Sequence, residues 1–295
     1  MALTDSKNMV SVWDFDGTWT DVGKEAETYL AAYHELLSQE RSASEPYGIG
    51  IPLETLHLLL DQARNEVLDN PEAHGWYHDG VIVAPACADP YLLNKASAWL
   101  MIKRLREEKS GNHLPKENEL DALLSIIHEK AYEKSGTFFV QDAQRYLVSL
   151  HKAHRLVIVT NVDTMTVKAK LRFLLRGTGI EADEIALFGS ARKYRLDHGW
   201  ETVPPSTNFP GLNRPVYLRR RDYYNVLKSI GLTKLALVVG DIGELDLILP
   251  DALGIPTALL TSNRTPRWEL DYWSNHSNGF SSSALEEIVD KIFQL

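Results

Sequence analysis

Two aspartates one residue apart, Asp14 and Asp16, directly follow a run of strand-forming residues, Val10–Trp13. Gly17 then opens a loop. Because the chain leaves the extended geometry where a strand ends, both carboxylates can converge on one point there. Two carboxylates this close repel each other unless a cation or a shared proton lies between them, and oxygen ligands suit Mg²⁺. The pair therefore predicts a site for a divalent cation.

The same four residues are compatible with two other structures. Asp-Gly is a common turn pair, and Asp-x-Asp-Gly can also begin a calcium-binding loop. A calcium loop needs a glutamate at its twelfth position, and counting from Asp14 that residue is Glu25. The apolar residues Phe15 and Trp19 do not fit such a loop, so the rest of the chain must decide.

Two further apolar runs end in polar residues. The first ends at Thr160 and Asn161, and the second ends at Gly240 and Asp241, with Asp246 five residues later. Strands buried on both faces appear as continuous apolar runs, and the carboxyl ends of parallel strands form the ligand crevice of an open sheet. The sequence thus predicts a parallel α/β sheet that gathers these polar residues at one edge.

This order and spacing of motifs resembles the haloacid dehalogenase (HAD) superfamily, whose members are mostly phosphatases. The resemblance implies that Asp14 is the nucleophile and that Asp16 is the general acid and base. It implies that Thr160 binds the transferred phosphoryl group, and Asn161 beside it is expected to contribute. The metal ligands implied for Mg²⁺ are Asp14, the main-chain carbonyl of Asp16, Asp241 and Asp246.

The family also has a lysine or arginine that balances the charge of the nucleophile and the phosphate. An arginine triplet just before a predicted helix is the expected source, with Arg220 favoured, Arg219 next and Arg221 also open. Lys193 is a rival if the predicted β insertion follows this motif and does not precede it. An arginine triplet is also often simply a solvated basic patch.

Asp16 separates the reactions of the superfamily. Members that cleave carbon–halogen bonds lack this second aspartate, because a halide leaves without a proton. The alcohol of a phosphate ester leaves as an alkoxide, so a positioned acid assists its departure. The same group, once deprotonated, can then activate water. The presence of Asp16 therefore favours phosphoryl transfer.

A long segment separates the first strand from the second motif. By resemblance, residues 22–150 form a mainly α-helical C1 cap domain, while 1–21 and 151–295 form a HAD-like, Rossmann-like core with a parallel sheet. A small β insertion is expected at about 185–218. Apolar periodicity predicts the helices of the long segment at 23–38, 53–67, 90–107, 117–134 and 140–153.

Of two shorter segments, residues 75–80 have two interpretations and residues 167–175 have one. Residues 75–80, Gly-Trp-Tyr-His-Asp-Gly, could form a loop that contacts the substrate, although aromatic residues in a helical lid more often pack internally. Residues 167–175 predict an amphipathic helix, and Lys168, Lys170 and Arg172 are expected on its solvated face.

The composition describes a packed protein without strong affinity for polyanions. The chain has 295 residues, 44% of them hydrophobic, and a formal net charge of −9. This charge argues against general binding to nucleic acid or anionic membranes. Cys87 is the single cysteine, and residues 1–9 contain no apolar stretch, so a cytoplasmic location is expected. A small phosphorylated molecule is the expected partner, and a homo-oligomer stays open.

Two other functions remain compatible with the same residues. A phosphomutase or phosphotransferase would share the whole core site and differ in what accepts the phosphoryl group. A non-catalytic protein would bind a ligand or partner through the cap. Carboxylates gathered at strand ends repel each other unless a cation is bound, which favours the enzyme.

Overall fold

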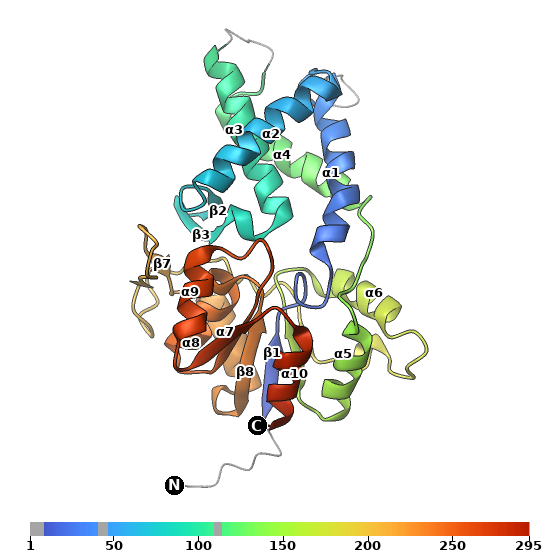
Figure 1. Cartoon of the computed structure of the whole chain (residues 1–295), viewed down its shortest axis with the longest axis vertical. Coiled ribbons are helices and arrows are strands. Elements are labelled where there is room, and N and C mark those ends of the chain that lie inside the picture. Colours follow the sequence, from blue (N-terminus) through green and yellow to red (C-terminus); the bar gives the residue numbers. More distant parts are fainter. Residues whose placement is uncertain (1–8, 41–46, 109–113, 295) are drawn as a thin grey trace. The chain divides into compact units, whose positions relative to one another are not determined.

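The computed structural model describes residues 9–40, 47–108 and 114–294 of the chain (Figure 1). The chain forms two compact units. The core unit comprises Met1–Asp21, Trp76–Ala84 and Phe139–Leu295, and the helical unit comprises Val22–Gly75 and Pro85–Phe138. Residues 1–9 were expected to contain no apolar stretch, and residues 1–8 lie outside the described part.

The core unit is built on a six-stranded sheet in the order β10-β9-β8-β1-β4-β5, and every neighbouring pair is parallel. This confirms the predicted α/β fold class. The strands are β1 Val10–Trp13, β4 Leu156–Val159, β5 Leu187–Phe188, β8 Leu235–Gly240, β9 Thr257–Leu260 and β10 Gly279–Ser282. The helices of this unit are α5 Ala143–Lys152, α6 Thr164–Leu174, α7 Arg221–Ile230, α8 Ile248–Ala252, α9 Arg267–Asn275 and α10 Leu285–Gln294.

Both faces of this sheet are buried. Successive side chains of each strand point to opposite sides, and the side chains of each side pack in a separate cluster. Trp13 and Ile158 belong to a core cluster with α5, α6 and α10. Val12 and Val157 belong to a second cluster with α7, α8 and α9. The strands therefore contain continuous apolar runs, as parallel strands covered by helices on both faces require.

The register of the sheet aligns the ends of its central strands. Trp13 pairs with Ile158 of β4 and with Val239 of β8. Asp14 continues this alignment, since its N–H donates to the carbonyl of Val239 at 2.9 Å. The residues that follow the three strands consequently begin at the same edge of the sheet, as the sequence predicts.

The helical unit contains the four long helices of the predicted insertion. They are α1 Val22–Ser38, α2 Leu53–Asp69, α3 Pro90–Glu108 and α4 Glu117–Tyr132, with a single turn, η2, at Ala86–Ala88. Tyr29, Leu56, Ile102 and Leu124 are fully buried in one cluster between them. The periodicity predicted these helices correctly. None of the helices in the described parts of the chain is long and apolar enough to cross a membrane.

The unit boundaries differ from the predicted domain limits in two places. Helix α5, expected in the insertion, belongs to the core unit because Leu147 and Leu150 pack in the cluster that contains Trp13. A two-stranded sheet of β2 Gly75–His78 and β3 Val81–Pro85 interrupts the helical unit, and its residues 76–84 also belong to the core unit. Local periodicity reports helices but not the unit against which they pack.

The small β insertion begins later than residue 185. The segment Leu187–Phe188 is the edge strand β5 of the main sheet, paired with β4. The insertion proper contains β6 Ser206–Thr207 and β7 Val216–Tyr217, which pair antiparallel. The insertion therefore follows Lys193 in the chain, and this order bears on whether Lys193 or an arginine lies at the edge of the sheet.

Candidate active site

A buried lysine joins two of the predicted acidic residues. The Nζ of Lys193 donates to Asp14 Oδ1 at 2.5 Å and to Asp246 Oδ1 at 2.9 Å, and its side chain is 1% exposed. Asp14 follows β1, and Asp246 lies in the turn Gly243–Leu247 after β8. Because the β insertion follows Lys193, the condition under which Lys193 was a rival to the arginines is met.

Arg220 does not lie at the carboxylates, and the sequence-based preference for it is corrected. Its guanidinium is fully buried and donates to four main-chain carbonyls: Tyr217 at 3.1 Å, Lys193 at 2.7 Å, Leu245 at 3.3 Å and Val83 at 2.9 Å. Burial lowers the pKa of Arg220 to about 10, against the raising effect of nearby acids. Arg220 therefore ties together segments that surround the site.

The neighbouring arginines are also occupied elsewhere. Arg219 Nη1 donates to the carbonyl of His198 at 2.6 Å, and its Nε donates to that of Val203 at 3.4 Å. Arg221 pairs with Asp197 at 3.4 Å on the exposed surface. A triplet of basic residues gives no sign of which one turns inward, because the inward direction depends on the loop that precedes the helix.

Asp14, Asp241 and Asp246 form one acidic group. Each contributes a carboxylate oxygen, and these oxygens all lie within 4.8 Å of one another. Gly17 permits this approach: its φ is +79°, and a Cβ on it would lie 2.0 Å from Asp241 Oδ2. Gly240 does the same beside Asp246, where a Cβ would lie 2.5 Å from the Cβ of Asp246.

The donor set of this group fits a small divalent cation. Lys193 occupies one oxygen each of Asp14 and Asp246, and the second oxygen of Asp246 accepts from the Ile242 N–H at 3.1 Å. Asp14 and Asp241 each also contribute a carboxylate oxygen to the group, and oxygen ligands are those that Mg²⁺ prefers. Asp246 orients Lys193 in this arrangement.

The charges of the group are strongly coupled. Burial raises the pKa of Asp14, Lys193 opposes this rise, and Asp246 and Asp16 add to it. Burial lowers the pKa of Lys193, but the carboxylates of Asp14 and Asp246 outweigh it, so the overall direction is upward. The carboxylates of the group outnumber the ammonium of Lys193. The remaining negative charge favours the binding of a second cation.

Thr160 and Asn161 both lie at the site edge, with different roles. Thr160 is 2% exposed, and its Oγ1 accepts from the Val162 N–H at 3.3 Å, which leaves the hydroxyl proton to donate. Asn161 Oδ1 accepts from the main-chain N–H of Lys193 at 2.7 Å. Asn161 thus holds the loop that carries Lys193, and its amide NH₂ group is the part that can face a ligand.

Lys170 is a site residue that sequence reasoning missed. It was expected on a solvated face, yet it is 8% exposed and its Nζ donates to Asp16 Oδ1 at 2.9 Å. The available signal was its spacing: Val167, Leu171 and Leu174 form the buried stripe of α6, and Lys170 falls within that stripe.

The aromatic segment at 75–80 lies beside the residue that follows Lys193. The ring of Trp76 stacks on Tyr194, with ring centroids 4.3 Å apart and planes at 26°. The ring centroid of His78 lies 6.1 Å from that of Tyr194. Contact with a substrate remains a prediction for this segment, whose packing partner is now identified.

A buried acidic layer supports the turn that carries Asp246. Glu244 is fully buried and accepts two hydrogen bonds from Arg214, at 2.7 and 2.8 Å. Glu269 accepts from the N–H groups of Gly243 and Glu244 at 2.9 and 2.7 Å. Burial, with Glu244 nearby, raises the pKa of Glu269 to about 8.

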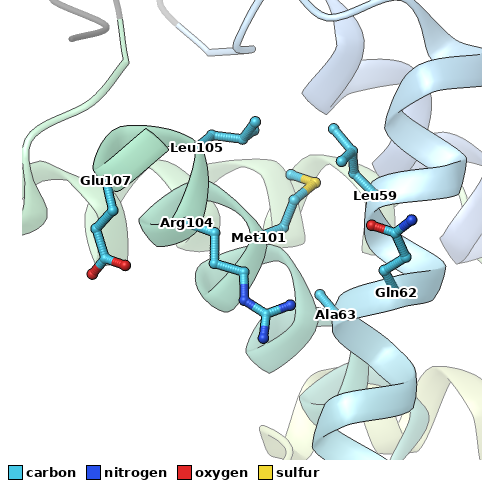
Figure 2. A pocket seen from close by; sticks show the side chains of 7 residues that line it. All are labelled: Leu59, Gln62, Ala63, Met101, Arg104, Leu105 and Glu107. Carbon is cyan, nitrogen blue, oxygen red and sulfur yellow. The ribbon is translucent and has the colours of Figure 1, made fainter. Parts of the chain in front are cut away.

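The helical unit has a pocket of about 200 Å³ between α2 and α3 (Figure 2). Arg104 at its wall forms an ion pair with Glu66. The pocket is lined by Leu59, Gln62, Ala63, Met101, Arg104, Leu105 and Glu107. These residues include none of the acids, hydroxyls or lysines described above.

Comparison with known proteins places the fold. No protein-family model and no curated protein matches the chain. The solved HAD-hydrolase YfnB from Bacillus subtilis, bound to magnesium, is 14% identical, with 97% of this chain and 98% of that chain covered and a TM-score of 0.52. A predicted phosphoglycolate phosphatase from Haemophilus somnus 129pt is 14% identical, with coverages of 98% and 99% and a TM-score of 0.51. A 2-haloacid dehalogenase from Pseudomonas syringae is 15% identical, with coverages of 97% and 98% and a TM-score of 0.45. The first two of these structures, with TM-scores of 0.52 and 0.51, show that the chain has the fold of the haloacid dehalogenase-like hydrolases.

Proposed function

We propose that this protein is a Mg²⁺-dependent phosphohydrolase that acts on a small phosphorylated metabolite through an aspartyl-phosphate. The observation that carries the proposal is the group of Asp14, Asp241 and Asp246 around Lys193 at the carboxyl edge of the sheet. Its charges are those that phosphoryl transfer requires: a carboxylate nucleophile, an ammonium and ligands for a metal ion.

Asp14 attacks the phosphorus, and the bond from phosphorus to the ester oxygen breaks with its electron pair going to that oxygen. Asp16 supplies the proton that this oxygen needs. Thr160 and Lys193 hold the phosphoryl oxygens while charge develops on them. Water then attacks the phosphorus of the aspartyl-phosphate and gives a proton to Asp16, which frees Asp14 and inorganic phosphate.

Asp14, Asp241 and the main-chain carbonyl of Asp16 are the groups we assign to Mg²⁺. When bound, the ion supplies positive charge that neutralises the phosphoryl oxygens. Asp246 supports this arrangement through Lys193 and the Ile242 N–H.

The test is phosphate release from a panel of phosphorylated metabolites, with Mg²⁺ and with EDTA. The wild-type protein should release phosphate only with the metal, and Asp14→Asn should abolish release without changing the circular dichroism spectrum. Full activity of Asp14→Asn would contradict the proposal. Adding an acceptor alcohol separates the alternative, because a transferase would form a new phosphate ester in place of free phosphate.

A further inference from the structure

The two carboxylate oxygens of Asp16 have different surroundings. Oδ1 accepts from Lys170 Nζ at 2.9 Å and from Thr20 Oγ1 at 3.3 Å. Oδ2 is buried and has no hydrogen-bond partner among the described residues. An ammonium has donors only, so the oxygen that it binds stays an acceptor. The proton that Asp16 exchanges therefore belongs on Oδ2.

The position of Lys170 on α6 explains how it reaches Asp16. Helix α6 follows β4, the strand that pairs with β1, and Asp16 lies three residues beyond the end of β1. Side chains of a helix lean toward its amino terminus, so a long side chain here extends toward the carboxyl edge of the sheet. The chain thus spans from the buried stripe of α6 to the site.

A lysine in a buried stripe has a cost that its partner must offset. An ammonium removed from water is unfavourable unless it is paired and hydrogen-bonded. Lys168, two residues earlier on the same helix, has a 26% exposed side chain and pairs with the exposed Asp183. The comparison shows that α6 carries one lysine suited to the surface and one that is committed to Asp16.

We infer that Lys170 is a positioning residue, which holds Asp16 through Oδ1 so that Oδ2 performs the proton transfers. In the first step the proton passes from Oδ2 to the departing ester oxygen. In the second step water attacks phosphorus and its proton passes to Oδ2. The inference rests on the proposed function, because it assigns a task only within that reaction.

The test compares two substrates that differ in their need for an acid. An alkyl monophosphate has a poor leaving group, the alkoxide, which needs the proton. p-Nitrophenyl phosphate releases nitrophenolate, a stable anion that does not need it. Lys170→Met keeps the length and apolar stem of the side chain and removes the ammonium. We expect kcat/KM for the alkyl ester, which reports only the steps up to release of the alcohol, to fall about 100-fold, the scale of a general acid's contribution. We expect kcat/KM for the nitrophenyl ester to stay nearly unchanged, whereas hydrolysis of the aspartyl-phosphate, which both esters share, can slow kcat for both.

Three further variants separate positioning from a structural role. Lys168→Met is the matched control on α6 and should leave both rates unchanged. Lys170→Arg keeps the positive charge and should restore a large part of the alkyl-ester rate. Asp16→Asn should show the same substrate-dependent loss, and adding Lys170→Met to it should cause no further loss, since the lysine acts through Asp16.

The outcomes are distinct. An equal loss of kcat/KM for both substrates in Lys170→Met, or a further loss in the Asp16→Asn background, would show a structural role and overturn the inference while leaving the phosphatase intact. No phosphate release by the wild-type protein from either ester or from the metabolite panel would overturn the proposed function and the inference together.

Discussion

Both the side chain and the main chain of Lys193 have hydrogen-bond partners at the candidate site. Its ammonium contacts both Asp14 and Asp246, and its main-chain groups are held by Asn161 and Arg220. Removing one partner of a buried ionic group leaves the others uncompensated, which is more damaging than never having had the group. The residue therefore links the charge balance of the site to the stability of its loop.

Replacing Lys193 should impair both properties. Lys193→Met should lower the free energy of unfolding by about 3–5 kcal/mol, because two buried carboxylates lose their counter-ion. It should also lower kcat by about 100-fold or more, the scale on which a donor to the developing charge contributes. Urea denaturation in EDTA and phosphate release with Mg²⁺ measure the two effects.

Arg219→Met is the comparison variant, because the sequence suggested Arg219 for the same task. The structure places its guanidinium on the carbonyls of His198 and Val203, so a much smaller loss of activity is expected. A greater loss of kcat in Arg219→Met than in Lys193→Met would return the role to the arginines.

Residue types and spacing were enough to predict the acids but not the cations. Asp14 and Asp241 each directly follow a strand, so their positions come from local pattern alone. Lys193 lies in a loop and Lys170 on a helix, and both reach the site through long side chains. Which of several basic residues turns inward depends on packing between distant segments, which a single sequence does not record.

At the scale of elements, short irregular segments set the geometry at the edge of the sheet. Ser190 and Arg192, on either side of Ala191 before Lys193, have φ values of +53° and +50°, in the left-handed region that favours glycine. Hydrogen bonds from the Ser190 and Ala191 N–H groups to the carbonyls of Val162 and Thr160 hold this conformation. The loop after β5 is thereby tied to the loop after β4, which positions Lys193.

Gly17 allows a direct test of the loop after β1. Gly17→Ala should abolish Mg²⁺-dependent phosphate release, because its Cβ would lie 2.0 Å from Asp241 Oδ2 and must displace that carboxylate. Gly177→Ala is the matched control: Gly177 has the same φ of +79°, but nothing lies within 4 Å of the added Cβ. It should cost about 1–2 kcal/mol of stability through the backbone alone and keep activity. Equal activity of the two variants would contradict the assigned place of Asp241.

The elements themselves were largely predictable, and their grouping was not. Helical periodicity predicted α1 to α4, and continuous apolar runs predicted the central strands β1, β4 and β8. Strand β5 has two residues, and β2 with β3 forms a short sheet inside a helical segment. Such short elements are defined by their partners, and so the sequence placed β5 in the β insertion and predicted no strands at β2 and β3.

At the scale of the whole molecule, buried acids couple stability to pH. Glu269 has a pKa raised from 4.5 to about 8 by burial and by Glu244. A carboxyl group with a raised pKa in the folded state contributes stability that is present below the unfolded pKa and is lost as pH rises through the folded pKa. The window for this group is therefore between pH 4.5 and about 8.

Glu269→Gln isolates this contribution, because glutamine stays neutral at every pH. The free energy of unfolding of the wild-type protein relative to this variant should fall as pH rises from 5 to 8, as measured by urea denaturation. A difference between the two proteins that stays constant or increases over this range would show that Glu269 is ionised in the fold throughout.

The central claim concerns Asp14 as a nucleophile, and trapping its covalent product tests it most directly. The protein is mixed with Mg²⁺ and the best substrate of the panel, quenched in acid within one turnover, and digested for mass spectrometry. The account predicts one phosphoryl group on the peptide that contains Asp14, which is lost on treatment with hydroxylamine and absent from Asp14→Asn. Rapid phosphate release with that peptide unmodified at every quench time, or with the phosphoryl group on another residue, would contradict it.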